Sequence, residues 1–144
     1  MVSKDDYQYA LTQLGFIKEN ASRTGGSHIR YHHSKYEKII TGIDDHKNTK
    51  EMKSNVHREL IKAMSLILWL VCKDENNIID FEKVKKITAK LNDELKNALI
   101  KNLKKLNENK PNLLIQIVPK KLLTEISRAN NDISDETIIE FIMK

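Results

Sequence analysis

The chain has 144 residues, 40% of them hydrophobic and 31% charged, which suffices for one domain or for one small domain with an accessory unit. Its formal net charge of +5 permits phosphate binding without requiring it, and its single cysteine excludes a disulfide framework or a thiolate metal site. The longest apolar stretch, residues 63–72, is too short to cross a bilayer, and residues 1–10 lack the apolar core of a signal peptide. We therefore expect a soluble, cytoplasmic protein with no membrane contact.

The first half of the chain predicts a helix, three strands and a second helix. Residues 4–14 place apolar side chains at helical spacing, and Gly15 follows as a helix stop. Short alternating segments predict three strands, over residues 16–20, 27–33 and 37–43. A polar loop then leads to a helix that begins near Met52.

The second half of the chain predicts helices throughout. An apolar stripe at spacings of three or four predicts one long helix over residues 80–106, with Asp80 as its cap. Residues 112–118 fit either a strand or a helix. Further helices are expected over residues 119–129 and after Ser134. The expected class is α+β, with an α-β-β-β-α unit over residues 1–72. A helical extension over residues 73–144 would pack on that unit or mediate homo-oligomerisation.

Residues 25–33, with the sequence GGSHIRYHH, gather most of the side chains that could form a site. In a strand, alternation puts His28, Arg30 and His32 on one face. His33 lies on the other face, where we expect it to be structural or exposed. Adjacent histidines on opposite faces cannot easily share one ion, and no carboxylate follows at ligand spacing. The sequence therefore predicts no metal site and no cofactor.

Three short motifs in the first half occur in a fixed order. They are Gly15-Phe16, then Gly26-Ser27-His28, then His46 ahead of the second helix. Over residues 4–65 this order resembles the HicA family of bacterial toxin–antitoxin modules. The resemblance implies a fold like a double-stranded-RNA-binding domain and a toxin that cleaves mRNA as an endoribonuclease. It also implies a cognate HicB-like antitoxin as partner, and it singles out His28 as the catalytic residue.

The chemistry of the residues agrees with an RNA substrate. An imidazole such as that of His28 titrates near neutrality and can take a proton from a ribose 2′-hydroxyl, so that a metal-independent cleavage is possible. The backbone N–H groups of Gly26 and Ser27 could meet a phosphate oxygen, and Arg30 and His32 could extend the substrate-binding surface. A solvated strand face without catalytic function would have the same pattern.

A second group of candidate RNA contacts follows the third strand. His46, Lys47 and Lys50 could track a phosphate backbone, although a run of charges is more often a solvated face. Asp44 stands where the family has a proline, and the two carboxylates of Asp44 and Asp45 would repel phosphate. The alternative function is therefore a non-catalytic RNA-binding or protein-interaction module with the same fold. In a third interpretation, the helical half shields or dimerises the ribonuclease half.

Overall fold

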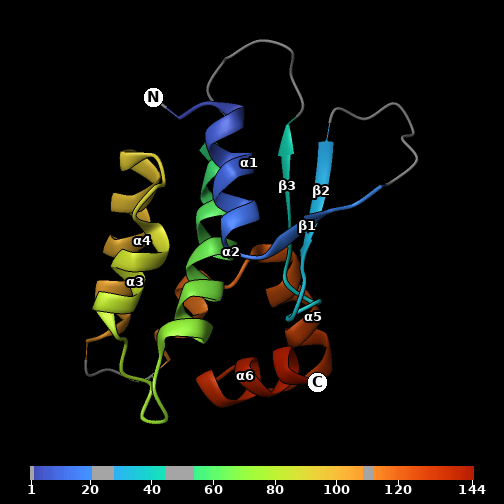
Figure 1. Cartoon of the computed structure of the whole chain (residues 1–144). Coiled ribbons are helices and arrows are strands. Elements are labelled where there is room, and N and C mark those ends of the chain that lie inside the picture. Colours follow the sequence, from blue (N-terminus) through green and yellow to red (C-terminus); the bar gives the residue numbers. More distant parts are fainter. Residues whose placement is uncertain (1, 21–27, 45–53, 109–111) are drawn as a thin grey trace.

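The computed structural model describes residues 2–20, 28–44, 54–108 and 112–144. Its elements, in chain order, are α1 (Lys4–Gln13), β1 (Phe16–Lys18), β2 (His28–His33), β3 (Ile40–Asp44), α2 (Ser54–Cys72), α3 (Phe81–Thr88), α4 (Asp93–Leu106), the 3-10 helix η1 (Leu114–Ile117), α5 (Lys120–Ala129) and α6 (Asp135–Met143) (Figure 1). The strands therefore all lie in the first part of the chain, between α1 and α2. This arrangement confirms the predicted α+β class.

The three strands form one antiparallel sheet in the order β1-β2-β3. β2 is the central strand, with His33 opposite Phe16 on β1 and His28 opposite Asp44 on β3. β3 begins at Ile40, later than expected, because residues 34–39 form the turn between the strands. Since side chains alternate between the two faces of a sheet, this register decides which residues of neighbouring strands share a face.

One face of the sheet packs against α1 and α2 (Figure 1). Phe16, Tyr31 and Ile43 point to this side and are buried. α1 begins with a capping box, in which the N–H of Asp6 donates to Oγ of Ser3 at 3.1 Å and the N–H of Ser3 donates to Oδ2 of Asp6 at 2.9 Å. Because α1 and α2 both pack on this one face, they do not cover the opposite face of the sheet.

The helix α2 lies at the centre of the molecule. Every residue from Ala63 to Trp69 is buried, so the helix is covered around its whole circumference. β3 packs on one side of it, while α3, α4 and η1 pack on the other. One hydrophobic cluster runs from Val2 to Ile142. The division into residues 1–72 and 73–144 stays a prediction, and so does a homo-oligomer through the later helices.

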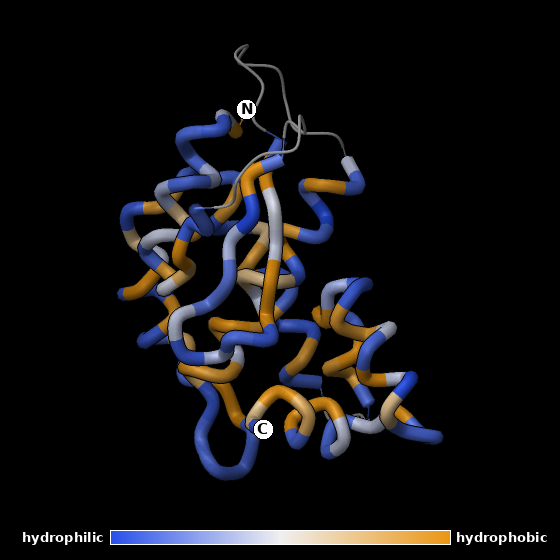
Figure 2. The backbone as a smooth tube through the Cα atoms, turned by 90° about the vertical axis from the view of Figure 1, so that its right-hand side faces the viewer, coloured by the Kyte–Doolittle hydropathy of each residue, from blue (hydrophilic) through white to orange (hydrophobic). Residues whose placement is uncertain are grey.

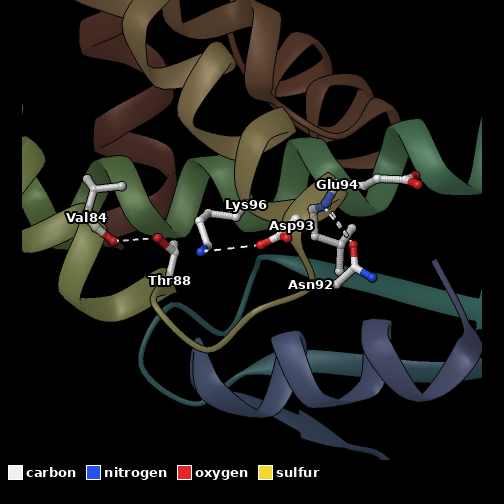
Figure 3. Close-up of polar contacts among 7 residues, drawn as sticks. Val84, Thr88, Asn92, Asp93, Glu94 and Lys96 are labelled. Carbon is white, nitrogen blue, oxygen red and sulfur yellow. Dashed lines mark hydrogen bonds and ion pairs between the residues drawn. The ribbon is translucent and has the colours of Figure 1, made fainter. Parts of the chain in front are cut away.

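The single helix expected over residues 80–106 is wrong, because the chain turns between Thr88 and Asn92. The hydroxyl of Thr88 donates to the carbonyl oxygen of Val84 at 2.8 Å, inside the last turn of α3 (Figure 3). Asn92 then caps α4, where its Oδ1 accepts from the N–H of Glu94 at 2.9 Å. An asparagine side chain can accept from the free backbone N–H groups at a helix start, and it is less favourable in a helix interior. The chain therefore begins a new helix at this point, although the continuous apolar stripe predicts an unbroken one.

The apolar residues of the predicted stripe face the core both before and after the turn. Val84 on α3 and Leu95, Leu99 and Leu103 on α4 are all buried. On the exposed side of α4, Lys96 pairs with Asp93 one turn earlier at 3.6 Å (Figure 3). The periodicity therefore predicts the buried face of both helices, although Ile87 and Leu106 of the same stripe are only half-buried, and it misses the break.

The later helices close the fold near the turn between β2 and β3 (Figure 1). The ambiguous segment at residues 112–118 contains the short 3-10 helix η1. Ser134 caps α6 as expected, with its Oγ accepting from the N–H of Thr137 at 3.2 Å. Lys38, in the turn, donates to the carbonyl oxygen of Phe141 on α6 at 2.8 Å, and its Nζ lies 4.3 Å above the phenyl ring. None of the described helices is both long enough and apolar enough to span a membrane.

Candidate active site on the open face of the sheet

The face of the sheet that points away from α1 and α2 carries the candidate site. We call it the open face, and Figure 2 views the molecule from this side. His28, Arg30 and His32 of β2 lie on it, as their alternation predicts, with His28 and Arg30 exposed and His32 half-buried. Their neighbours on this face include Ile17 of β1, Glu19 just after β1, and Asp44 of β3.

His28 lies against a buried carboxylate. Its Nδ1 lies 2.9 Å from Oδ1 of Asp44, which stands directly opposite on β3. Because an ionised carboxylate can only accept, this contact favours a hydrogen on Nδ1 of His28, which in a neutral ring leaves Nε2 as the nitrogen that can accept a proton. The His28 side chain is 72% exposed, whereas that of Asp44 is 6% exposed. The carboxylate thus orients the ring from below, and a basic nitrogen is presented to solvent.

Arg30 and His32 share one carboxylate. Oε2 of Glu19 lies 3.6 Å from Nε of Arg30 and 3.3 Å from Nδ1 of His32. Glu19 is held beside them because its backbone N–H donates to the carbonyl oxygen of Arg30 at 2.9 Å, which extends the pairing of β1 with β2. The positive charge of Arg30 is therefore partly neutralised, and His32 faces the same carboxylate.

The spacing along β2 separates the candidates into near and far positions. Antiparallel strands rise about 3.4 Å per residue, so Arg30 lies roughly 7 Å from His28 and His32 roughly 14 Å from it. Arg30 can therefore reach a phosphate that His28 acts on. His32 lies too far along the strand for that, and it can only meet a neighbouring part of a bound chain.

His33 faces the opposite side of the sheet and is only 5% exposed. Its Nε2 donates to the carbonyl oxygen of Leu14 at 2.8 Å, and its Nδ1 accepts from the N–H groups of Lys35 and Tyr36, both at 3.1 Å. The ring also stacks on Tyr36. Both ring nitrogens are used by the backbone, so His33 holds the turn after β2 in place, in agreement with a structural role.

The surroundings of His33 favour its neutral form. Burial lowers the pKa of its imidazole, and the nearby Lys35 and His32 act in the same direction, while the bond to Leu14 opposes them.

The close approach of His33 to the backbone also accounts for the glycine of the Gly15-Phe16 motif. Gly15 has a φ of +91°, and a Cβ placed there would come within 2.8 Å of Nε2 of His33.

Five of the predicted substrate-binding and candidate contact residues lie outside the described part of the chain. They are Gly26, Ser27, His46, Lys47 and Lys50. The structure therefore tests neither the phosphate cradle before β2 nor the basic segment after β3. Among the described residues, no group of three or more His, Cys, Asp or Glu side chains could hold a metal ion.

Sequence reasoning missed the two carboxylates of the open face. The sequence predicts that Asp44 repels phosphate, but its carboxylate is buried and lies 2.9 Å from Nδ1 of His28. The signal that could have found it is the register: antiparallel pairing of two strands around a six-residue turn at 34–39 brings residue 28 opposite residue 44. Glu19 follows from the same rule, since it continues β1 opposite Arg30.

Comparison with known proteins gives no match, whether to protein-family models, to curated proteins or to solved structures. The HicA resemblance therefore stays a prediction.

Proposed function

We propose that this protein is a metal-independent endoribonuclease in which His28 is the catalytic base. The observation that carries the proposal is the 2.9 Å contact between Nδ1 of His28 and Oδ1 of Asp44, together with the exposure of the same side chain. A carboxylate that fixes the tautomer and the orientation of a histidine is a recurrent device of acid–base catalysis.

RNA suits such a site because it carries its own nucleophile. The 2′-oxygen attacks the adjacent phosphorus, the bond from phosphorus to the 5′-oxygen breaks, and a 2′,3′-cyclic phosphate forms. The 2′-hydroxyl proton moves to Nε2 of His28, and the leaving 5′-oxygen takes a proton from water. Asp44 is a positioning residue that stabilises the imidazolium formed in this step. Arg30, about 7 Å along the strand, can hold a phosphate oxygen and stabilise the developing charge.

We further propose a biological setting from the family resemblance. The order α-β-β-β-α agrees with a fold like a double-stranded-RNA-binding domain. A HicA-like toxin would act on mRNA, and a HicB-like antitoxin would cover the open face. A small antitoxin gene in the neighbouring reading frame would support this setting, and induction of the protein alone should then arrest bacterial growth.

The direct test is RNA cleavage by the purified protein in the presence of a metal chelator. We expect His28→Ala to lower kcat by about 10²-fold or more, the usual contribution of a general base. Asp44→Asn should lower kcat as well, since the ring loses the carboxylate that orients it. A cyclic phosphate at the product end identifies the 2′-hydroxyl as nucleophile.

A matched variant on the same strand is His32→Ala. Because His32 lies about 14 Å from His28, we expect this variant to raise KM and to leave kcat nearly unchanged. An unchanged kcat in His28→Ala would refute the proposed base. Equal losses of kcat in His28→Ala and His32→Ala would show that the substitutions disturb the sheet in general and that the loss is not specific to His28.

The second candidate function is a non-catalytic RNA-binding or protein-interaction module. Two observations favour it: Glu19 partly neutralises Arg30 and faces His32, and Ile17 is 48% exposed on the same open face. An apolar side chain between polar ones is typical of a contact surface for protein. Pure protein that binds RNA but never cuts it would favour this module.

A further inference from the structure

A second concave site lies between α2, α4 and η1. Its volume is about 460 Å³, within the range of small-ligand pockets. Two isoleucines, Ile61 and Ile117, contribute apolar surface to its lining. This pocket is distinct from the open face, because none of its lining residues belongs to the sheet.

The polar lining of the pocket is dominated by basic side chains. His57, Arg58 and Lys62 come from α2, and Lys105 comes from α4. None of the described residues that line the pocket is acidic. The carboxylate of Glu59 lies 3.6 Å from Nζ of Lys62 and also accepts the backbone N–H of Lys120 at 2.6 Å. The carboxylate of Glu59 is thus already bound to these two groups, and Glu59 is not part of the pocket lining.

Two of the lining side chains are held by hydrogen bonds from outside the pocket. Nδ1 of His57 lies 2.7 Å from the hydroxyl of Tyr7 on α1, which is buried. Asn102 donates to the hydroxyl of the fully buried Ser65 at 3.2 Å. Fixed side chains lose little freedom when a ligand binds, so these contacts prepare the pocket for one.

We propose that this pocket binds a phosphate group of a nucleotide or of an RNA chain. The guanidinium of Arg58 can bind two phosphate oxygens at once, and the ammonium group of Lys105 adds positive charge beside it, whereas Lys62 is already paired with Glu59. The isoleucines and the amide groups of Asn102 and Gln116 then suit the base or ribose next to that phosphate. The site does not depend on the proposed ribonuclease activity, since none of its residues belongs to the open face.

The test compares two double variants that remove the same charge from exposed positions. Arg58→Gln with Lys105→Gln empties the pocket of two cations, whereas Lys86→Gln with Lys90→Gln removes two cations outside it. Calorimetry at low ionic strength measures binding of adenosine 5′-monophosphate and of a short RNA with a 5′-hydroxyl end. The RNA titrations use the His28→Ala background, so that no cleavage interferes.

We expect the pocket variant to weaken binding by at least about tenfold, because charge-assisted bonds each contribute more than this factor. The control variant should stay within about twofold of the wild type. If the pocket variant binds the mononucleotide more weakly than the control variant does, the ligand is a free nucleotide. If only its binding of RNA is weakened, the ligand is a phosphate within an RNA chain. Equal loss in both double variants, or no saturable binding of either probe, would overturn the proposal. RNA cleavage that persists in the pocket variant separates this result from the proposed function.

Discussion

At the scale of single residues, the two carboxylates of the open face act differently on their histidines. Asp44 is buried and leaves Nε2 of His28 to the solvent, so it supports a base. Glu19 lies beside both Arg30 and His32 and reduces the positive potential that a phosphate would meet. The first carboxylate therefore favours chemistry on RNA, and the second opposes binding of it.

This difference predicts the effect of removing the second carboxylate. Glu19→Gln should strengthen RNA binding several-fold at low salt, because Arg30 keeps its charge and loses the acid that competes with phosphate. Filter binding with RNA measures the change. Glu82→Gln, on the exposed side of α3 beside Lys85, removes an equal charge far from the open face. The same gain in both variants would mean that only net charge matters.

His33 predicts how stability depends on pH. Its pKa in the fold lies below the ordinary 6.5, mainly through burial. Well above this pH the ring is neutral in both the folded and unfolded states. As the pH falls from 6.5 toward the folded pKa, the unfolded chain binds more protons. The free energy of unfolding therefore decreases, at a rate of at most about 1.4 kcal/mol per pH unit from this one group.

Urea unfolding of the wild type and of His33→Gln over this pH range measures the contribution. The variant should be less stable at neutral pH, since the backbone bonds around the turn are weakened, and its stability should fall less steeply toward acid. An NMR titration of the His33 ring reads the same property directly. A midpoint at or above 6.5 would contradict the neutral, buried form.

At the scale of elements, the start of α4 depends on one side chain. Asn92 caps the helix through its Oδ1, and its amide donates to Oδ2 of Asp6 on α1 at 3.2 Å. We expect Asn92→Ala to lower the free energy of unfolding by about 1 kcal/mol or somewhat more. Asn92→Ser keeps a capping oxygen and loses the amide donor, so it should cost less. Chemical denaturation measures both, and equal losses would assign the effect to the contact with α1 rather than to the cap.

The same turn shows what the sequence could and could not predict. Periodicity identified the buried faces of α3 and α4 because the apolar spacing persists on both sides of the break. Asn92 followed by Asp93 and Glu94 is a helix-start pattern, but the prediction rested on the continuous apolar stripe alone. Alternation assigned the faces of His28 and His33 correctly. The partner Asp44 required the register between two strands, which depends on the length of the turn rather than on any local motif.

At the scale of the whole molecule, α2 joins the sheet to the later helices. Its buried residues serve both sides, and the hydrophobic cluster is continuous through it. Neither side can bury its own apolar surface without this helix. The sheet that carries His28 should therefore share its stability with α4 and η1, although these elements lie far from the open face.

We accordingly expect one cooperative unfolding transition for the full chain. Leu99 on α4 is completely buried, so Leu99→Ala should lower the free energy of unfolding by about 2–5 kcal/mol. Because the core is shared, fluorescence of Trp69 and NMR signals of β2 should move to the new midpoint together. Ile115→Ala, at a position 38% exposed on η1, should change the midpoint much less. Separate midpoints, with β2 unaffected by Leu99→Ala, would instead establish residues 1–72 as an independent domain and would make its isolated activity on RNA measurable.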